Sequence, residues 1–186
     1  MLLEVVIAVA IILLLAAIVT PVILGGLDAA RVDQAKNVFA NLAAGLQAFD
    51  DHLGSNAGPP ANRSEYPNNL THLVNPVTTA QSNICGRAYD TGDVGEWNGP
   101  YLNQDVPTTG VKTGIGTINA ATVLLSATMM AMRMPNVSWE DAVALNDVVD
   151  GDGNTVSGSP GGSVRFGAAD VNGLVTLDYA VPIQSC

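Results

Sequence analysis

The first nineteen residues form an almost unbroken apolar run. Between Met1 and Val19 only Glu4 is charged, and no residue from Val5 to Val19 is polar. About 20 apolar residues in a helix span the hydrocarbon core of a bilayer. The pattern therefore predicts a hydrophobic helix half over 1–27 that is able to lie in a membrane. A carboxylate there is costly, about +2.5 to +3.5 kcal/mol at mid-membrane on insertion scales, so Glu4 needs an explanation.

A second pattern covers residues 28–53. Apolar residues recur there at spacings of three and four, which is typical of one face of a helix: Val32, Ala35, Phe39, Leu42, Leu46, Phe49 and Leu53. The spacing predicts an amphipathic helix half that packs on the rest of the protein and ends at Gly54. Pro21 removes one helical hydrogen bond, and Gly25 and Gly26 weaken the next turn. A kink or an unwound section is therefore expected near residues 18–26.

Residues 54–186 predict a globular head made of short strands and turns. Apolar runs alternate there with Gly, Asn, Thr, Ser and Asp. The stretch between Gly116 and Pro135 favours one strand over a helix, and its methionines are expected to fill gaps in a core rather than bind a metal. Residues 164–181 alternate around Asn172 and Gly173, which predicts a tight hairpin.

One short helix is predicted inside the head. Ser138 begins SWEDAVALNDVV, with Asp141 three residues on, which is typical of a capped helix. Together with the strands it gives an α+β fold, in which a small antiparallel sheet lies on the apolar stripe of the long helix.

Charge and cysteine content narrow the class of protein. The net charge is −10 and only seven residues are Lys or Arg, so no basic patch is available to neutralise nucleic-acid phosphates. The two cysteines are Cys85 and Cys186. The apolar segment indicates that the remainder is exported, and an exported pair is usually oxidised, so a disulfide between them is expected.

Candidate chemistry in the head is sparse. Asp150, Asp152 and Asn154 are spaced like the start of a calcium loop, but Gly161 stands where a bidentate Glu belongs. A solvated turn is the favoured interpretation, with calcium as the weak alternative and no other cofactor expected. Trp97 and Tyr101 are expected to pack rather than to bind a ligand. No catalytic constellation is found, so an enzyme is not expected.

The N-terminal pattern resembles that of type IV pilins and pseudopilins. Glu4, the run AIILLLAAIVTP and Pro21, seventeen residues after Glu4, keep the spacing of that family. The amphipathic half that follows also fits, so the resemblance covers about 53 residues. In the head, NGPYL at residues 98–102 resembles a short motif of major pseudopilins and several pilins, where it sets the entry to the sheet. The family usually has one more residue before the Glu, often N-methylated, so a residue is expected before Met1.

The resemblance implies a type IV pilin-like fold and a filament-forming subunit. The helix half 1–27 would form the filament core. Glu4 would pair with the N-terminal amine of a neighbouring subunit, which Met1 carries in this sequence. The unassembled subunit would reside in the inner membrane and would then be incorporated into a pilus on the cell surface. The partners implied are further copies of the chain, a prepilin peptidase, a platform protein and an assembly ATPase.

Alternatives remain open at this point. A pseudopilin of a type II secretion system shares the N-terminal pattern, and NGPYL favours it. A membrane-anchored exported enzyme or binding protein is less consistent with the joint pattern of Glu4 and Pro21. Glu4 alone could also be a carboxylate that reaches to the headgroups at the membrane edge.

Overall fold

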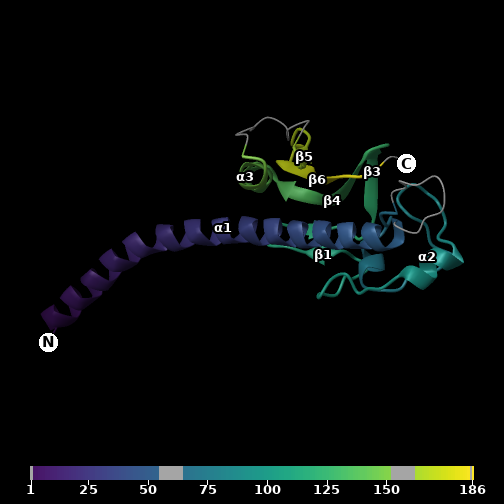
Figure 1. Ribbon diagram of the computed structural model, residues 1–186. Helices are drawn as coiled ribbons and strands as arrows, with labels where there is room; N and C mark the ends of the chain where they lie inside the picture. The colour runs from purple at the N-terminus through teal and green to yellow at the C-terminus, as the bar shows by residue number, and fades with distance from the viewer. Residues whose placement is uncertain (1, 55–64, 152–161, 185) are drawn as a thin grey trace.

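One helix runs through the whole protein. The computed structural model describes residues 2–54, 65–151, 162–184 and 186, and of residues 2–3 and 18–25 it describes the backbone alone. Helix α1 (Leu2–Gly54) is 53 residues long, and its N-terminal half extends away from the head (Figure 1). The unwound section expected near residues 18–26 is absent, because α1 is continuous there. The ribbon instead curves in its N-terminal half, and a long helix can absorb one missing hydrogen bond as curvature.

A four-stranded antiparallel sheet lies along one side of the C-terminal half of α1 (Figure 1). Its order is β3 (Thr122–Ser126), β4 (Met129–Ser138), β6 (Leu174–Pro182) and β5 (Val164–Phe166). Helix α3 (Trp139–Val149) contacts both α1 and the sheet. These elements confirm the predicted α+β class and the antiparallel sheet on the long helix.

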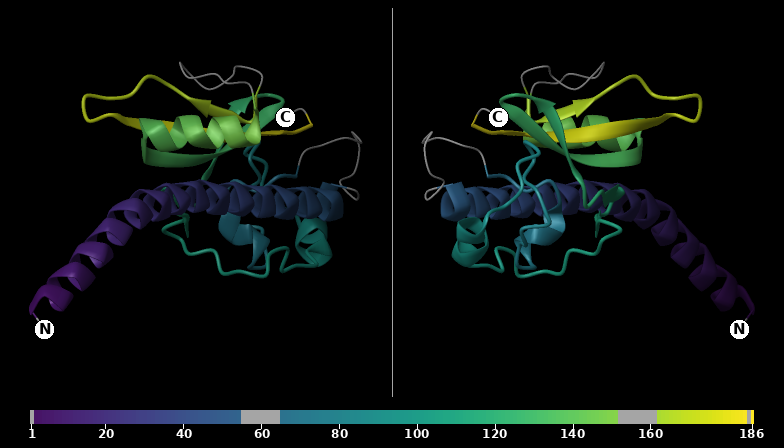
Figure 2. Two further views of the ribbon diagram at one scale, coloured as in Figure 1. Left: turned by 90° about the vertical axis from the view of Figure 1, so that its left-hand side faces the viewer. Right: turned by 90° about the vertical axis from the view of Figure 1, so that its right-hand side faces the viewer.

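A second layer covers the other side of α1. The 3-10 helix η1 (Leu70–Leu73) and helix α2 (Thr91–Glu96) lie on the side away from the four-stranded sheet, as both views of Figure 2 show. A two-stranded sheet of β1 (Val111–Lys112) and β2 (Thr117–Ile118) follows them in the chain. The C-terminal half of α1 therefore lies between two layers, a placement that the sequence did not predict.

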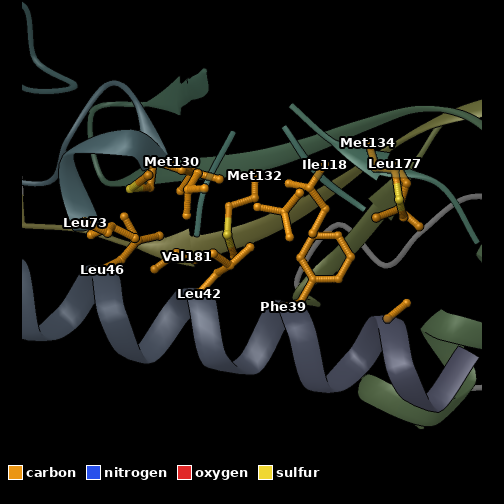
Figure 3. Close-up of a cluster of buried hydrophobic side chains, with 14 of the residues drawn as sticks. Phe39, Leu42, Leu46, Leu73, Ile118, Met130, Met132, Met134, Leu177 and Val181 are labelled. Atoms are coloured by element: carbon orange, nitrogen blue, oxygen red, sulfur yellow. The ribbon is translucent and has the colours of Figure 1, made fainter. Parts of the chain in front are cut away.

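The predicted helix stripe forms the centre of the core. All seven of its residues are at most 5% exposed: Val32, Ala35, Phe39, Leu42, Leu46, Phe49 and Leu53. Figure 3 shows Phe39, Leu42 and Leu46 directed toward the sheet and its methionines. Met130, Met132 and Met134 are fully buried, which confirms the interpretation of these methionines as core residues.

The stretch between Gly116 and Pro135 is not one strand. It contains β2 and the β3–β4 hairpin, in which Leu124 pairs with Met130 across a turn at Ala127 and Thr128. No Gly, Pro or Asn marks that turn, so the pattern missed it. Strand β4 also continues past Pro135, because a bulge between Met134 and Val137 leaves the proline outside the ladder.

The hairpin of β5 and β6 is confirmed, but its turn is longer than two residues. Phe166 pairs with Leu177, and the turn is built on Asp170. The Asp170 carboxylate accepts hydrogen bonds from the amides of Asn172 (2.8 Å) and Leu174 (2.9 Å). Gly173 has a φ of +76°, a conformation that glycine adopts without a steric penalty.

The predicted cap of α3 forms in part. The Ser138 hydroxyl accepts a hydrogen bond from the Asp141 amide at 3.1 Å, as expected of an N-cap. The Asp141 carboxylate accepts from the Ser138 hydroxyl at 2.7 Å instead of reaching back to a backbone amide. The shorter Asp side chain thus completes only half of a capping box.

The predicted disulfide is present. Cys85 and Cys186 are joined with an S–S distance of 2.04 Å and a Cα–Cα distance of 5.4 Å. The Cys186 amide also donates to the Ala127 carbonyl oxygen at 3.0 Å. The C-terminus is therefore held against the β3–β4 turn and the loop that carries Cys85.

Candidate functional site

The exposed half of α1 is apolar on all its sides. Every side chain from residue 4 to residue 17 is exposed, and its large apolar residues are exposed by 49% to 67%: Val5, Val6, Ile7, Val9, Ile11, Ile12, Leu13, Leu14 and Leu15. Exposed apolar patches of this extent usually mark an interaction surface. Within the described part of the chain, no helix has the combined length and hydropathy of a membrane span.

Glu4 lies in the first turn of this exposed half. Among the described residues no cation approaches its carboxylate, and the next charged residue along the chain is Asp28. Met1, the predicted partner in a neighbouring copy, lies outside the described residues. Pro21 lies within the continuous helix, whose side chains are not described at that point.

The exposed half ends at a charged junction around Arg31. Its Nε donates to the Gly114 carbonyl oxygen at 3.0 Å and its Nη1 to the Asp28 carboxylate at 3.1 Å. Its Nη2 lies 3.7 Å from the Asp141 carboxylate of α3. A hollow of about 670 Å³ between α1 and α3 adjoins this junction. Sequence reasoning missed the junction, because its members are far apart in the chain.

A buried cluster of charges lies behind the C-terminal end of α1. Arg87 Nη2 is 2.6 Å from Glu65 Oε1 and 2.9 Å from Asp93 Oδ2, and the Glu65 side chain is fully buried. Asn83 donates to the other Glu65 oxygen at 3.0 Å. These contacts fasten the layer that carries α2, and nothing in the residue pattern predicted them.

Asp50 connects α1 to this cluster. Its carboxylate accepts a hydrogen bond from the Glu65 amide at 2.6 Å. Burial raises the pKa of Asp50 to about 6, and the nearby carboxylates of Asp51 and Glu65 add to the rise, although the Glu65 amide opposes it. The arrangement makes Asp50 a candidate pH-sensitive contact of the head.

Trp97 and Tyr101 pack against the core, as predicted. The Trp97 indole N–H donates to the His72 carbonyl oxygen at 2.9 Å. The Tyr101 ring lies 5.5 Å from the ring of Phe49 and 5.7 Å from that of Trp97. The next strand after NGPYL is β1 of the two-stranded sheet, so the segment does not lead directly into the four-stranded sheet.

Of the three calcium candidates, only Asp150 lies among the described residues. The Asp150 carboxylate accepts hydrogen bonds from the amides of Ser163 and Val164, both at 2.9 Å, and thereby anchors the start of β5. Asp152 and Asn154 lie outside the described residues. Within the described part of the chain, no group of three or more His, Cys, Asp or Glu side chains is arranged to hold a metal.

Comparisons with known proteins give no relative. No protein family model, no curated protein and no solved structure matches this chain. The features of the chain that bear on its function are the exposed half of α1, the junction at Arg31 and the disulfide-closed head.

Proposed function

We propose that this protein is the structural subunit of an extracellular filament of the type IV pilus class. The observation that carries the proposal is the apolar N-terminal half of α1, which projects from a packed head (Figure 1) and whose described side chains at 4–17 are all exposed. Burying apolar surface contributes about 25 cal/mol per Å². Packing of these helices side by side in a filament core would keep that surface out of water, with contacts between helices in place of contacts with lipid.

Glu4 is the residue that would set the register of the copies. A lone carboxylate in an apolar core is costly, and removing one partner of a buried pair typically costs about 3–5 kcal/mol. The N-terminal amine of a neighbouring copy is a cation at the same end of an equally apolar helix. A copy shifted along the axis would leave both charges unpaired, so the Glu4–amine pair would favour one register.

The head supports an extracellular role. The Cys85–Cys186 disulfide ties down the C-terminus, and disulfides persist mainly in oxidising compartments. In this proposal the unassembled subunit resides in the inner membrane. A prepilin peptidase, a platform protein and an assembly ATPase then act on it, and the head forms the outer surface of the pilus.

A second candidate is a pseudopilin of a type II secretion system. NGPYL favours it, because this motif resembles one in major pseudopilins and its Tyr101 lies against α1 in the head. Such a subunit would form a short periplasmic assembly rather than a surface pilus.

Electron microscopy of material sheared from cells that express the chain separates the two candidates. Long filaments whose mass spectrum matches the chain support the pilus. A secretion defect on deletion, without surface filaments, supports the pseudopilin. A chain that purifies only as monomers from membranes and culture medium, with normal secretion after deletion, contradicts both.

A further inference from the structure

We infer that Arg31 is a positioning residue for assembly, because it fixes the angle at which the apolar half of α1 leaves the head. The inference rests on the proposed function. Arg31 stands at the boundary between the two halves of the helix: its neighbour Val32 is 5% exposed, whereas Leu27 is 56% exposed. Beyond Arg31 toward the N-terminus, α1 has lost the cover of the head.

The guanidinium joins three parts of the protein. It donates to the Gly114 carbonyl oxygen in the β1–β2 connection at 3.0 Å, and it lies 3.7 Å from Asp141 at the start of α3. The third contact, to Asp28 at 3.1 Å, is within α1 itself and orients the side chain. One side chain on α1 thus contacts both the β1–β2 connection and α3.

Backbone packing reinforces the connection. A Cβ atom added to Gly114 would lie 2.7 Å from the Arg31 carbonyl oxygen and 2.8 Å from its Cα. The β1–β2 connection therefore lies directly on the backbone of α1 at Arg31, and only glycine leaves room for that contact. The angle between helix and head is set by this contact and by the guanidinium together.

The length of the exposed half makes that angle important. Arg31 lies 27 positions after Glu4, which corresponds to about 40 Å of helix at 1.5 Å per residue. A change of about 10° at Arg31 would therefore move Glu4 by about 7 Å on the same geometry. An ion pair requires an N–O distance within about 4 Å, so a loosely held helix would often present Glu4 out of reach of its partner.

The side-chain chemistry explains why arginine suits this position. The planar guanidinium offers five N–H donors in fixed directions, so it can serve acceptors on opposite sides at once. A lysine would keep the positive charge, but its single ammonium group could not donate to acceptors on opposite sides at once.

The distance between two spin labels, measured by double electron–electron resonance, tests the inference. Labels at Val9 on the exposed half and at Thr176 on β6 would be measured in the full chain in detergent, with the native disulfide oxidised. Both sites are exposed. Arg31→Gln, Arg31→Lys and Gly114→Ala should each shift or broaden the distance distribution by about 5 Å, since a change of about 9° acts on the roughly 33 Å of helix between Arg31 and Val9. Lys36→Gln is the matched control, because it removes the same charge from the same helix and a contact to the Val148 carbonyl oxygen.

Three results would overturn the inference: unchanged distances for Arg31→Gln and Gly114→Ala, a wild-type distribution for Arg31→Lys, or an equal shift for Lys36→Gln. The melting temperature of each variant verifies that the head is folded.

In cells, Arg31→Gln should lower filament yield about tenfold, which corresponds to about 1.4 kcal/mol. Normal yield with altered distances would overturn the role in assembly. The distance measurement does not require filaments, so a wild-type chain that never polymerises would contradict the proposed function without deciding the role of Arg31 in the helix angle.

Discussion

The ring of Phe39 on α1 lies stacked on the ring of Tyr179 on β6, with centroids 4.8 Å apart and planes inclined by 10°. Phe39 is fully buried. This pair joins the middle of the long helix to a central strand of the four-stranded sheet. The stacked pair is therefore one of the contacts that attach the sheet to the helix.

Phe39→Ala should therefore destabilise the head strongly. Truncation of a buried Phe leaves a cavity and typically costs about 3–5 kcal/mol. Urea unfolding followed by tryptophan fluorescence measures the loss. Leu13→Ala, on the exposed half of the same helix, is the control and should change the stability of the head by no more than about 0.5 kcal/mol. Equal effects of the two substitutions would contradict the described core.

Loss of the Cys85–Cys186 disulfide should also weaken the head. The cross-link joins residues 101 positions apart, and in the chain-entropy model a loop of that size is worth about 4–5 kcal/mol. The double variant Cys85→Ser/Cys186→Ser should unfold at a much lower urea concentration than the oxidised protein. The reduced wild type should match the double variant, because both lack the same cross-link. A midpoint unchanged by reduction would show that the native contacts alone hold the C-terminus.

Asp50 should make the head less stable as the pH rises from about 4 to about 6. Its pKa in the folded protein is raised to about 6 by burial, whereas an Asp in an unfolded chain titrates near 3.9. The folded state therefore binds more protons in this window, and its stability falls as the pH rises through it. Because Asp50 is partly solvated, the loss should be limited to about 1–2 kcal/mol.

The variant Asp50→Asn isolates this effect. The amide keeps an oxygen that can accept from the Glu65 N–H, yet it cannot ionise. The difference in unfolding free energy between the variant and the wild type should be small at pH 4 and should favour the variant at pH 7. Asp51→Asn, on the adjacent exposed residue, is the control and should show a much smaller dependence. A difference that stays constant from pH 4 to pH 7 would rule out Asp50 as the titrating group.

The parts of the fold that sequence predicted are those with a strong local signal. The stripe from Val32 to Leu53 repeats with the period of a helix, and each member is buried. The disulfide followed from two cysteines in a chain expected to be exported. The β5–β6 hairpin followed from alternation around Asn172 and Gly173, although its turn is built on Asp170, whose side chain bonds do not appear in a hydrophobic pattern.

The parts of the fold that the sequence did not predict lack a local signal or depend on contacts between residues far apart in the chain. The β3–β4 turn at Ala127 and Thr128 has no residue that favours a turn. Glu65 is fully buried in its ion pair with the half-buried Arg87, whereas isolated charges in a sequence predict a surface. The junction of Arg31 with Gly114 spans 83 positions. For the candidate site, the sequence identified Glu4 and its apolar surroundings. It could not identify Arg31, whose contacts with Gly114 and Asp141 appear only in the fold.

Substitution of Glu4 should abolish assembly without unfolding the head. Glu4 contacts no cation within the described chain, so Glu4→Leu should leave the urea midpoint of the head unchanged. In a filament, the same substitution would leave a neighbour's amine buried and unpaired, at a cost of about 3–5 kcal/mol. The concentration needed for polymerisation should therefore rise by about a hundredfold or more. Negative-stain microscopy and sedimentation of sheared material measure the loss. Asp33→Asn, which neutralises an exposed acid on the same helix, should assemble normally, and abundant filaments from Glu4→Leu cells would exclude the Glu4–amine pair as the device that sets the register.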